Sequence, residues 1–599
     1  SSRQVLDPTK MGTEACLSLL LLGAAQAQGN AHLGSIRAAE PAIKASIPRG
    51  VGADVDVDVD VEHPEDLVDI TMGTWSRIDY STGSVLPFVG RPWGMNQWAP
   101  QTNNYHPNGH DQKSWWFHPE DKELYGIRCT HQPSPWINDY GNFLVSAEMG
   151  LLKTNFPNKA TTFRVDKYSP YELDYTLDTY CDTDGNCMTL NLTGTSRGAM
   201  IHLTFPPFDE EAAAAGYDQT RRVRVLLSSN STDSIDFDAN SGRIFGFTQA
   251  NNGGVPMGYP YPPPSSSATC QPQGPFKNLG FSGNDLYHFG VDEGDVDKAA
   301  MQCQTQCCNE PKCLAWGLDY GSSTSTGGRL GAAPDGGDLP TCMGHDKCCW
   351  IKSMAGGAHS GQHISGWKKG YGPDDVQTMF HHFFELETTP VAAGGDVLQR
   401  VNDNMFTNGL EAYLEFPPTV QSIEVRIGTS FISGDQARLN LDRELPRNKT
   451  FTDIAQESRA RWNSVLGVVK VQGGEQGDPR GDKGRLVTFY SSMYRAAIFP
   501  RSLAEMNSTG HTIHWSPYDD NGNVFDGEIA TDSGFWDAYR TVYQLGALIH
   551  PLQYNKLIHG WMNAYREQGW LPGWPSPGER GAMAATMQDC IVADAIIVT

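Results

Sequence analysis

The segment from Thr531 to Leu545 has an amphipathic pattern. Its apolar residues fall mostly in steps of three and four, the spacing that places side chains on one face of a helix. They are Phe535, Tyr539, Val542, Tyr543 and Leu545. The pattern predicts one continuous helix with Trp536 and Asp537 side by side at its head.

A different pattern begins at Asp66, where short apolar runs alternate with turn residues. This arrangement is typical of a β-sandwich. The predicted strands are Phe163–Val165, Ala199–Phe205 and Arg222–Leu227, followed after a long interruption by Met379–Leu386 and Ile423–Phe431. We therefore assign residues 65–252 and 373–433 to one sandwich domain.

The interruption, residues 253–372, opens on a linker rich in Pro, Gly and Ser at Pro256–Ser267. Cys303 and Cys307 lie one helical turn apart, and cysteine-containing strands are predicted on either side of that helix. A helix pinned to a sheet by disulfides resembles the PAN/apple module, which binds proteins or glycans. The vicinal cysteines have poor spacing for the alternative, a zinc site. The candidate disulfide cysteines are Cys270, Cys303, Cys307, Cys308, Cys313, Cys342, Cys348 and Cys349, with Cys181 and Cys187 as an outlying pair.

Helical spacing returns after the sandwich. Gln436–Glu444 and Phe451–Leu466 are predicted as linker helices within residues 434–485. From Leu486 to the last residue the predicted helices lengthen and the composition turns apolar.

The first 64 residues are set apart from the fold. Met11–Ala27 is similar to a signal peptide, with an apolar run and a small-x-small cleavage site, so residues 1–28 are taken as upstream sequence and signal peptide. Asp54–Val61 alternates Asp and Val, which suits a strand, but its four Asp favour a solvated linker. Residues 29–64 are therefore predicted to be an acidic linker.

Composition limits the classes of partner. The 599 residues carry a net charge of -24, which argues against nucleic acid and anionic membranes as partners. No run of apolar residues is long enough for a membrane-spanning helix. The clustered cysteines and four glycosylation sequons, at Asn191, Asn230, Asn448 and Asn507, together favour a secreted protein.

Trp536 and Asp537 form a candidate sugar site. An apolar ring packs on the C–H face of a sugar, and a carboxylate accepts hydrogen bonds from its hydroxyl groups. The alternative is that Trp536 belongs to the core and that Asp537 is a helix N-terminal charge favoured by the dipole.

Several blocks rich in rare residues place this pair in a wider context. In their order along the chain they resemble glycoside hydrolase family 92, the calcium-dependent exo-α-mannosidases. The C-terminal blocks are Phe489–Arg501, His514–Trp515, Phe535–Arg540, Trp570–Pro575 and Ile591–Ala595. The N-terminal blocks are Leu67–Thr74, which resembles an opening strand, Pro92–Gln97, Trp115–Trp116, Gly126–His131 and Asp139–Gly141.

The resemblance implies a multidomain β + α fold: an N-terminal sandwich, the inserted PAN/apple-like module, and the start of an (α/α)6 barrel at residues 486–599. A barrel cut part-way is expected to expose a contiguous apolar flank. The resemblance also implies an inverting mechanism with a carboxylic acid, a carboxylate base and a calcium ion that holds sugar hydroxyls. In the family these groups lie mostly downstream of the block matched by Ile591–Ala595. We therefore expect them beyond Thr599 and assign no catalytic or calcium-binding residue here.

Candidate substrate-binding residues lie upstream of that point. Asp537 would accept a hydrogen bond from a hydroxyl group of the terminal sugar. Trp536 would pack beside it, and Arg540 would hold the carboxylate in place. Trp115 or Trp116 would stack on the sugar, although either suits an ordinary core. His131 would form a hydrogen bond to substrate or serve the structure alone.

Other metal-like patterns are weak. His511 and His514 have metal-binding spacing but no acidic partner, and the turn containing Asp519, Asp520 and Asn523 suits a surface loop equally well.

The sequence thus predicts a secreted exo-α-mannosidase acting on glycans with terminal α-mannose. One rival is a non-catalytic glycan- or protein-binding protein on a hydrolase scaffold. Another is a related glycosidase with a different sugar preference.

Overall fold

The computed structural model describes about two thirds of the chain. The described residues are 43–45, 62–75, 85–103, 116–132, 139–154, 160–227, 233–250, 381–400, 409–471, 481–519, 522–579 and 587–598, with 272–277, 280–281, 285–291, 295–309, 315–319, 347–352, 358–359 and 363–368 in the inserted region. The expected signal peptide, Asp54–Val61, Trp115 and the sequon at Asn230 lie outside these ranges.

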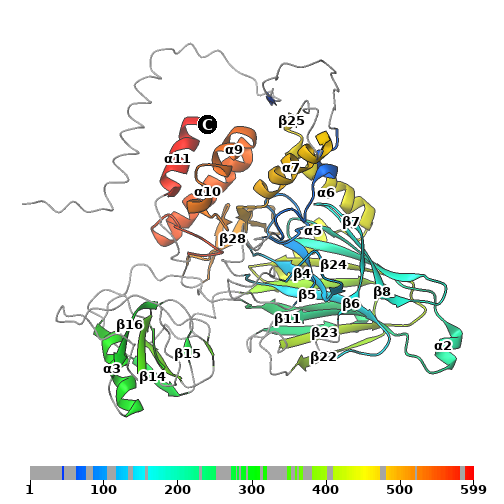
Figure 1. The fold of residues 1–599 in the computed structure, drawn as a ribbon, viewed down its shortest axis with the longest axis horizontal. Helices are drawn as coiled ribbons and strands as arrows, with labels where there is room; N and C mark the ends of the chain where they lie inside the picture. The colour runs from blue at the N-terminus through cyan, green and yellow to red at the C-terminus, as the bar shows by residue number, and fades with distance from the viewer. Residues whose placement is uncertain are drawn as a thin grey trace, which may run out of the picture.

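Two antiparallel sheets form the body of the N-terminal part (Figure 1). The eight-stranded sheet has the order β12 (Ser234–Asp238), β13 (Arg243–Thr248), β21 (His382–Thr389), β24 (Ser422–Ser430), β10 (Gly198–Thr204), β9 (Cys187–Gly194), β8 (Leu173–Cys181) and β7 (Arg164–Tyr168). The six-stranded sheet has the order β2 (Gln97–Gln101), β4 (Gly126–Thr130), β5 (Phe143–Met149), β11 (Arg221–Leu227), β23 (Gly409–Phe416) and β22 (Gly394–Arg400).

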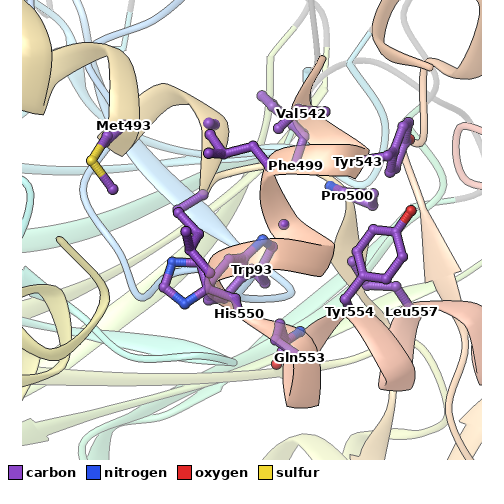
Figure 2. A pocket seen from close by; sticks show the side chains of 15 residues that line it. Trp93, Met493, Phe499, Pro500, Val542, Tyr543, His550, Gln553, Tyr554 and Leu557 are labelled. Atoms are coloured by element: carbon purple, nitrogen blue, oxygen red, sulfur yellow. The ribbon is translucent and has the colours of Figure 1, made fainter. Parts of the chain in front are cut away.

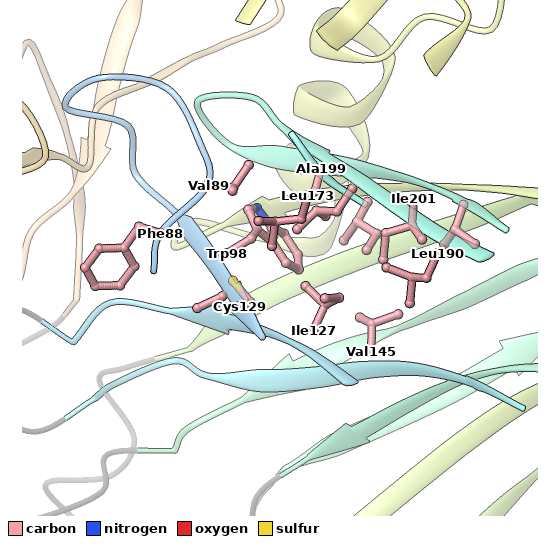
Figure 3. Packing of buried hydrophobic residues seen from close by; sticks show 14 of the residues in the cluster. Phe88, Val89, Trp98, Ile127, Cys129, Val145, Leu173, Leu190, Ala199 and Ile201 are labelled. Carbon is pink, nitrogen blue, oxygen red and sulfur yellow. The ribbon is translucent and has the colours of Figure 1, made fainter. Parts of the chain in front are cut away.

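The core lies between the two sheets. Side chains of Trp98 and Ile127 from one sheet meet Leu173 and Ile201 from the other, and all four are buried (Figure 3). The indole Nε1 of Trp98 donates a hydrogen bond to the carbonyl of Gly198 at 3.1 Å, which joins the sheets through a polar contact as well. Face-to-face packing of this kind defines a β-sandwich, and the predicted strands at Ala199–Phe205, Arg222–Leu227 and Ile423–Phe431 are confirmed within one or two residues.

The outer face of the six-stranded sheet carries a buried charge cluster. Arg224 of β11 lies between Glu148 of β5 and Glu411 of β23, and all three side chains are almost fully buried. The Nε of Arg224 donates to Glu411 at 2.6 Å, and its Nη1 donates to Glu148. Opposite charges therefore bridge three neighbouring strands at this face.

Two helices cover the eight-stranded sheet. Helix α5 (Gly434–Glu444) packs on β24 and β21, and α6 (Phe451–Leu466) packs on β9 and β10. Gly428 of β24 permits the close approach of α5, because a Cβ at Gly428 would lie 2.5 Å from the Cβ of Leu441. Both helices were predicted correctly, but they cover the sandwich and are not free linkers.

Helix α6 starts where its sequence provides a cap. The side chain of Thr450 accepts from the backbone N–H of Asp453, and the Asp453 carboxylate accepts from the backbone N–H of Thr450. This reciprocal capping box satisfies two backbone donors at the helix start. Trp462 and Leu466 of α6 then enter the sandwich core.

The inserted region contains a second, smaller sheet. Its order is β14 (Pro272–Lys277), β20 (His363–Lys368), β17 (Ala315–Asp319), β18 (Lys347–Lys352) and β16 (Asp285–Val291), and α3 (Val296–Asn309) packs against it (Figure 1). A disulfide joins Cys303 of α3 to Cys349 of β18. The predicted helix pinned to a sheet is therefore present, while its kinship with PAN/apple modules stays a resemblance.

The predicted disulfide cysteines are bonded wherever the structure describes their pairing. Cys181 and Cys187 join the ends of β8 and β9, and Cys307 and Cys308 are also disulfide-bonded. Cys270, Cys313 and Cys342 lie outside the described residues.

The C-terminal part is mainly helical, as expected, but it begins inside the sandwich core. Tyr490 and Tyr494 of α7 (Gly481–Ala496) belong to the same buried cluster as the sandwich strands. Short strands that the sequence did not predict follow: β26 (Arg501–Ser502), β27 (Glu505–Met506), β28 (Thr512–Trp515), β29 (Val524–Asp526) and β30 (Ala530–Thr531). The remaining helices are α8 (Phe535–Ala538), α9 (Val542–Ile549), α10 (Pro551–Gln568) and α11 (Met587–Val598).

Three sequence predictions are corrected here. The single helix with Trp536 and Asp537 at its head is wrong: Thr541 leaves the helical conformation, with φ -134° and ψ -87°, so that α8 and α9 are separate elements that both bury an aromatic ring, Phe535 and Tyr543. Leu67–Thr74 is not a strand: Leu67 ends a 3-10 helix, Pro64–Leu67, and turns follow it. Within the expected linker, β1 (Ile43–Ala45) pairs in parallel with β25 (Val469–Val471).

Within the described ranges no helix combines the length and the apolar character that crossing a bilayer requires.

Candidate substrate-binding site

Asp537 lies at the first turn of α8 and is exposed beside a second aromatic residue. Its Oδ2 accepts a hydrogen bond from the indole Nε1 of Trp574 at 3.2 Å. Its Oδ1 accepts no hydrogen bond from the described residues, and the neighbouring Trp536 is 47% exposed. The carboxylate is thus oriented by one donor while its other oxygen stays open to a ligand.

The backbone at Trp574 is held in place by the carboxylate of Glu579. The backbone N–H groups of Gly573 and Trp574 both donate to the carboxylate of Glu579, the latter at 3.3 Å. Gly534, at φ +42°, lies close to both Asp537 and Trp574, because a Cβ there would stand 3.4 Å from Asp537 Oδ2 and 3.5 Å from the Trp574 ring. Both distances are ordinary van der Waals contacts, so it is the positive φ of residue 534 that favours glycine at this turn.

The turn before α8 is anchored by Asp532. Asp532 adopts φ +54°, an uncommon conformation for a residue with a side chain, and is buried. Its carboxylate accepts from the hydroxyl of Tyr140 at 2.9 Å and from the hydroxyl of Ser576 at 2.6 Å. The Nη1 of the fully buried Arg501 lies 3.5 Å from its Oδ2.

Ser533 adds two further connections. Its carbonyl accepts from the hydroxyl of Tyr543 in α9, and its hydroxyl accepts from the indole of Trp561 in α10 at 3.1 Å. Residues 532–533 are consequently tied to the sandwich through Tyr140 and to two helices. This network fixes the direction in which α8 presents Trp536 and Asp537.

His131 has a structural environment. It is fully buried, its Nδ1 lies 2.7 Å from the carbonyl of Tyr140, and its Nε2 lies 2.9 Å from Oδ1 of Asn96. Its ring stacks on that of Tyr140 at 4.8 Å. Both ring nitrogens are engaged, so His131 supports Tyr140 and thereby Asp532, which matches the structural alternative.

Buried histidines predict a loss of stability in mild acid. Burial lowers the pKa of His382 to about 4, and burial together with the charge of Arg461 lowers the pKa of His550 to about 4, against 6.5 in the unfolded chain. The unfolded chain therefore binds protons first as the pH falls, so the stability due to these groups is complete above pH 6.5 and is lost towards pH 4. We expect the urea midpoint to fall between pH 7 and pH 4, and to fall less in His550→Gln. An equal pH dependence in both proteins would contradict the assignment to His550.

The other predicted contacts do not converge on Asp537. Trp116 is buried in the sandwich core with the Arg128 guanidinium 4.0 Å from its ring centre, which matches the alternative of an ordinary core residue. Arg540 lies over the ring of Tyr539 at 4.1 Å and makes no hydrogen bond to Asp537 in the described structure. The nearby donor to Asp537 is Trp574, which the sequence placed in a matched block without a role.

The histidine spacing at His511 and His514 does not form a metal site. His514 is buried, with Nε2 2.9 Å from Glu567, whereas His511 is exposed. Asp519 accepts the backbone N–H of Asn523 at 3.0 Å, as in a surface turn.

An apolar hollow separates α7 from α9 and α10 (Figure 2). Trp93, Phe499, Val542 and Leu557 are among its lining residues, and the volume is about 30 Å³. The hollow is too small and too apolar for a sugar. Helices α9 and α10 also expose Leu548 (61%) and Leu552 (79%).

Comparison with known proteins gives two family-level matches. Residues 67–282 match the model of the glycosyl hydrolase family 92 N-terminal domain, and residues 436–599 match the model of the family 92 catalytic domain. The two matches lie on the sandwich side and on the helical side of the molecule. They meet at the turn that carries Asp532 and Asp537.

Solved structures give the same result. A family GH92 inverting mannosidase from Bacteroides thetaiotaomicron VPI-5482 is 26% identical with a TM-score of 0.59, over 90% of this chain and 53% of its own. A family GH92 alpha-mannosidase from the same species, in complex with mannoimidazole, is 15% identical with a TM-score of 0.52, again over 90% of this chain and 53% of its own. At that identity the second structure shows the fold alone.

Among curated proteins, an "Uncharacterized secreted glycosidase" from Arthroderma benhamiae is 23% identical over 199 residues, which are 32% of this chain and 20% of that protein. The chain thus spans about half the length of the solved relatives and a fifth of the curated relative. From the two domain matches and the structural likeness over 90% of its length, we conclude that the chain belongs to glycosyl hydrolase family 92.

Proposed function

We propose that this protein is a glycoside hydrolase that releases terminal mannose from glycans as an inverting exo-α-mannosidase. The observation that carries the proposal is the pair of Asp537 and Trp574, in which an exposed carboxylate is oriented by an indole N–H beside the exposed ring of Trp536. The 26% identical relative is an inverting mannosidase, which supports the choice of sugar and of mechanism.

In this proposal Asp537 is a binding residue. Its Oδ1 accepts a hydrogen bond from a hydroxyl group of the terminal mannose, while Trp574 keeps Oδ2 in place. Trp536 then packs against an apolar face of the sugar ring. An inverting reaction further needs an acid and a base on opposite faces of the sugar, with a water between them; Asp537 is not assigned either role.

Calcium does not fit the ligand groups that the described residues offer. Three clusters contain three potential ligands each: His63, Glu65 and Asp66; Asp178, Cys181 and Cys187; and Cys129, His131 and His382. Each includes nitrogen or sulfur donors, whereas calcium prefers six to eight oxygen ligands. We therefore derive no step of the reaction through calcium.

A secreted location accompanies the proposal. The disulfides Cys181–Cys187 and Cys303–Cys349 require an oxidising compartment to form and persist. The name of the Arthroderma relative, a secreted glycosidase, also supports this location.

Replacing Asp537 tests the proposed function. We expect Asp537→Ala to weaken binding of methyl α-mannoside about tenfold or more, because a charged hydrogen-bond acceptor is lost. Calorimetry measures the affinity, and release of mannose from aryl α-mannosides and from glycans measures turnover.

Asp435→Ala is the matched control, since Asp435 is also an exposed carboxylate in the first turn of a helix. Equal affinity in the wild type and Asp537→Ala would refute the role of Asp537. Turnover of aryl α-mannosides would show that the catalytic acid and base lie within these residues, and a preference for another sugar would favour a related glycosidase.

A further inference from the structure

A second pocket lies where the sandwich meets the helical part. It encloses about 210 Å³ between the loops at Arg91–Met95 and Ser196–Arg197, helix α6, and helix α10. Neither Trp536, Asp537 nor Trp574 lines it. Its charged lining residues are Arg91, Arg197, Arg461, Lys556, Glu505 and Glu528.

Two of these charges are already satisfied within the protein. Arg197 donates from Nη1 to Glu444 at 2.9 Å and from Nε to the carbonyl of Ala504 at 2.9 Å. Glu505 is buried, and its carboxylate accepts from Ser430 at 3.0 Å and from Asn440 at 2.7 Å. Neither needs a further partner from the pocket.

The other three cations that line the pocket lack a strong ion pair. The guanidinium of Arg461 has no ion pair or hydrogen bond within the described residues, and its side chain is exposed. Arg91 reaches Glu457 only at 3.4 Å, and its Nε is buried without an acceptor there. Glu457 is shared with Lys449, so its charge is not available to Arg91 alone.

Lys556 completes the set. Its only close carboxylate in the described structure is Glu528, at 3.9 Å, the limit of an ion pair. Arg91, Arg461 and Lys556 therefore face one pocket that contains a single carboxylate without a strong partner, Glu528. The positive charge of Arg461 also acts on His550, where it adds to burial in lowering the pKa.

This local excess of positive charge contrasts with the net charge of -24 for the chain. Cations that line one small cavity repel each other unless an anion neutralises them. Guanidinium groups form paired, charge-assisted hydrogen bonds with tetrahedral oxyanions, and an ammonium adds a point charge. We propose that this pocket binds a phosphate or sulfate group, either as the free anion or as an ester on a glycan.

Isothermal titration of the full chain with inorganic phosphate at low ionic strength tests the proposal. We expect a dissociation constant below about 1 mM that rises with added NaCl, because the contacts are ionic. Arg461→Gln and Arg91→Gln are each expected to weaken phosphate binding about tenfold. Arg566→Gln is the control, since Arg566 is an exposed arginine of the same helix as Lys556 and does not line the pocket.

Arg461→Gln is expected to keep the wild-type melting temperature, because Arg461 makes no described contact to lose. Titrations with mannose 6-phosphate and with mannose distinguish the two sources of the anion. Tighter binding of mannose 6-phosphate than of phosphate supports an ester on a glycan, and equal binding supports the free anion. Absence of phosphate binding, or equal affinity in the wild type and both pocket variants, would overturn the proposal. The result is independent of the role of Asp537, which the pocket does not include.

Discussion

Replacing Asp532 with alanine is expected to lower the free energy of unfolding by about 3–5 kcal/mol. The change removes the acceptor for Tyr140 and Ser576 and leaves the buried Arg501 without its opposing charge. It also places a side chain without local hydrogen-bonding capacity at φ +54°. Urea denaturation at pH 7 followed by tryptophan fluorescence measures the loss.

Two further variants separate these contributions. Asp532→Asn keeps the shape, one of the two acceptor oxygens and the tolerance of asparagine for positive φ, so its cost reports the unbalanced charge of Arg501 together with the loss of one hydrogen bond. Combining Asp532→Asn with Arg501→Met removes that charge and should recover part of the loss. A cost below about 1 kcal/mol for Asp532→Ala would show that the pair does not hold the turn.

Replacing Arg224 with methionine is the second large effect, again about 3–5 kcal/mol. Methionine fills a similar volume, but Glu148 and Glu411 would lose the buried guanidinium that lies between them, and Glu148 would keep the ion pair with Arg222 at 3.9 Å. Thermal or urea unfolding of the full chain at neutral pH checks this prediction.

The chain offers a matched control for Arg224. Arg164 forms an ion pair with Asp178 at 2.7 Å on the sandwich surface, where solvent screens the charges. We expect Arg164→Met to cost less than about 1 kcal/mol. Equal costs for the two variants would mean that the cluster around Arg224 is not buried in solution.

The sandwich could be predicted because its strands carry their own pattern. In β8 alternate residues are buried from Leu173 to Leu177, as expected for a strand with one face in a core. The burial pattern of a strand does not show, however, which other strands pair with it. It could not show that β21 lies between β13 and β24, because the register between strands distant in sequence is set by packing of the whole sheet.

Helix α6 shows the same division between local and long-range information. Its predicted range, Phe451–Leu466, is confirmed, since a capping box starts the helix and apolar residues follow at helical spacing. Its description as a linker was wrong, because spacing identifies the buried face without identifying the surface against which that face packs. Trp462 buries that face in the sandwich core.

The candidate site was predictable only in part. Trp536 and Asp537 were found because they are adjacent in sequence, and the structure leaves both exposed. Trp574, which orients Asp537, is 37 residues away, and Tyr140, which anchors Asp532, is 392 residues away. No local pattern carries such contacts, and for the same reason the sequence left open whether His131 and Trp116 contact substrate or belong to the interior.

The burial of α6 and α7 in the sandwich has a practical consequence for dividing the molecule. Recombinant fragments that separate the two family domains near residue 436 would remove Trp462, Tyr490 and Tyr494 from the sandwich. The sandwich residues that these side chains cover would then be exposed. Such an N-terminal fragment would expose an apolar surface to solvent and should aggregate on expression. The buried cluster shared by the sandwich, α6 and α7 contains no described residue of the inserted region, so deletion of that region should leave the shared interior intact.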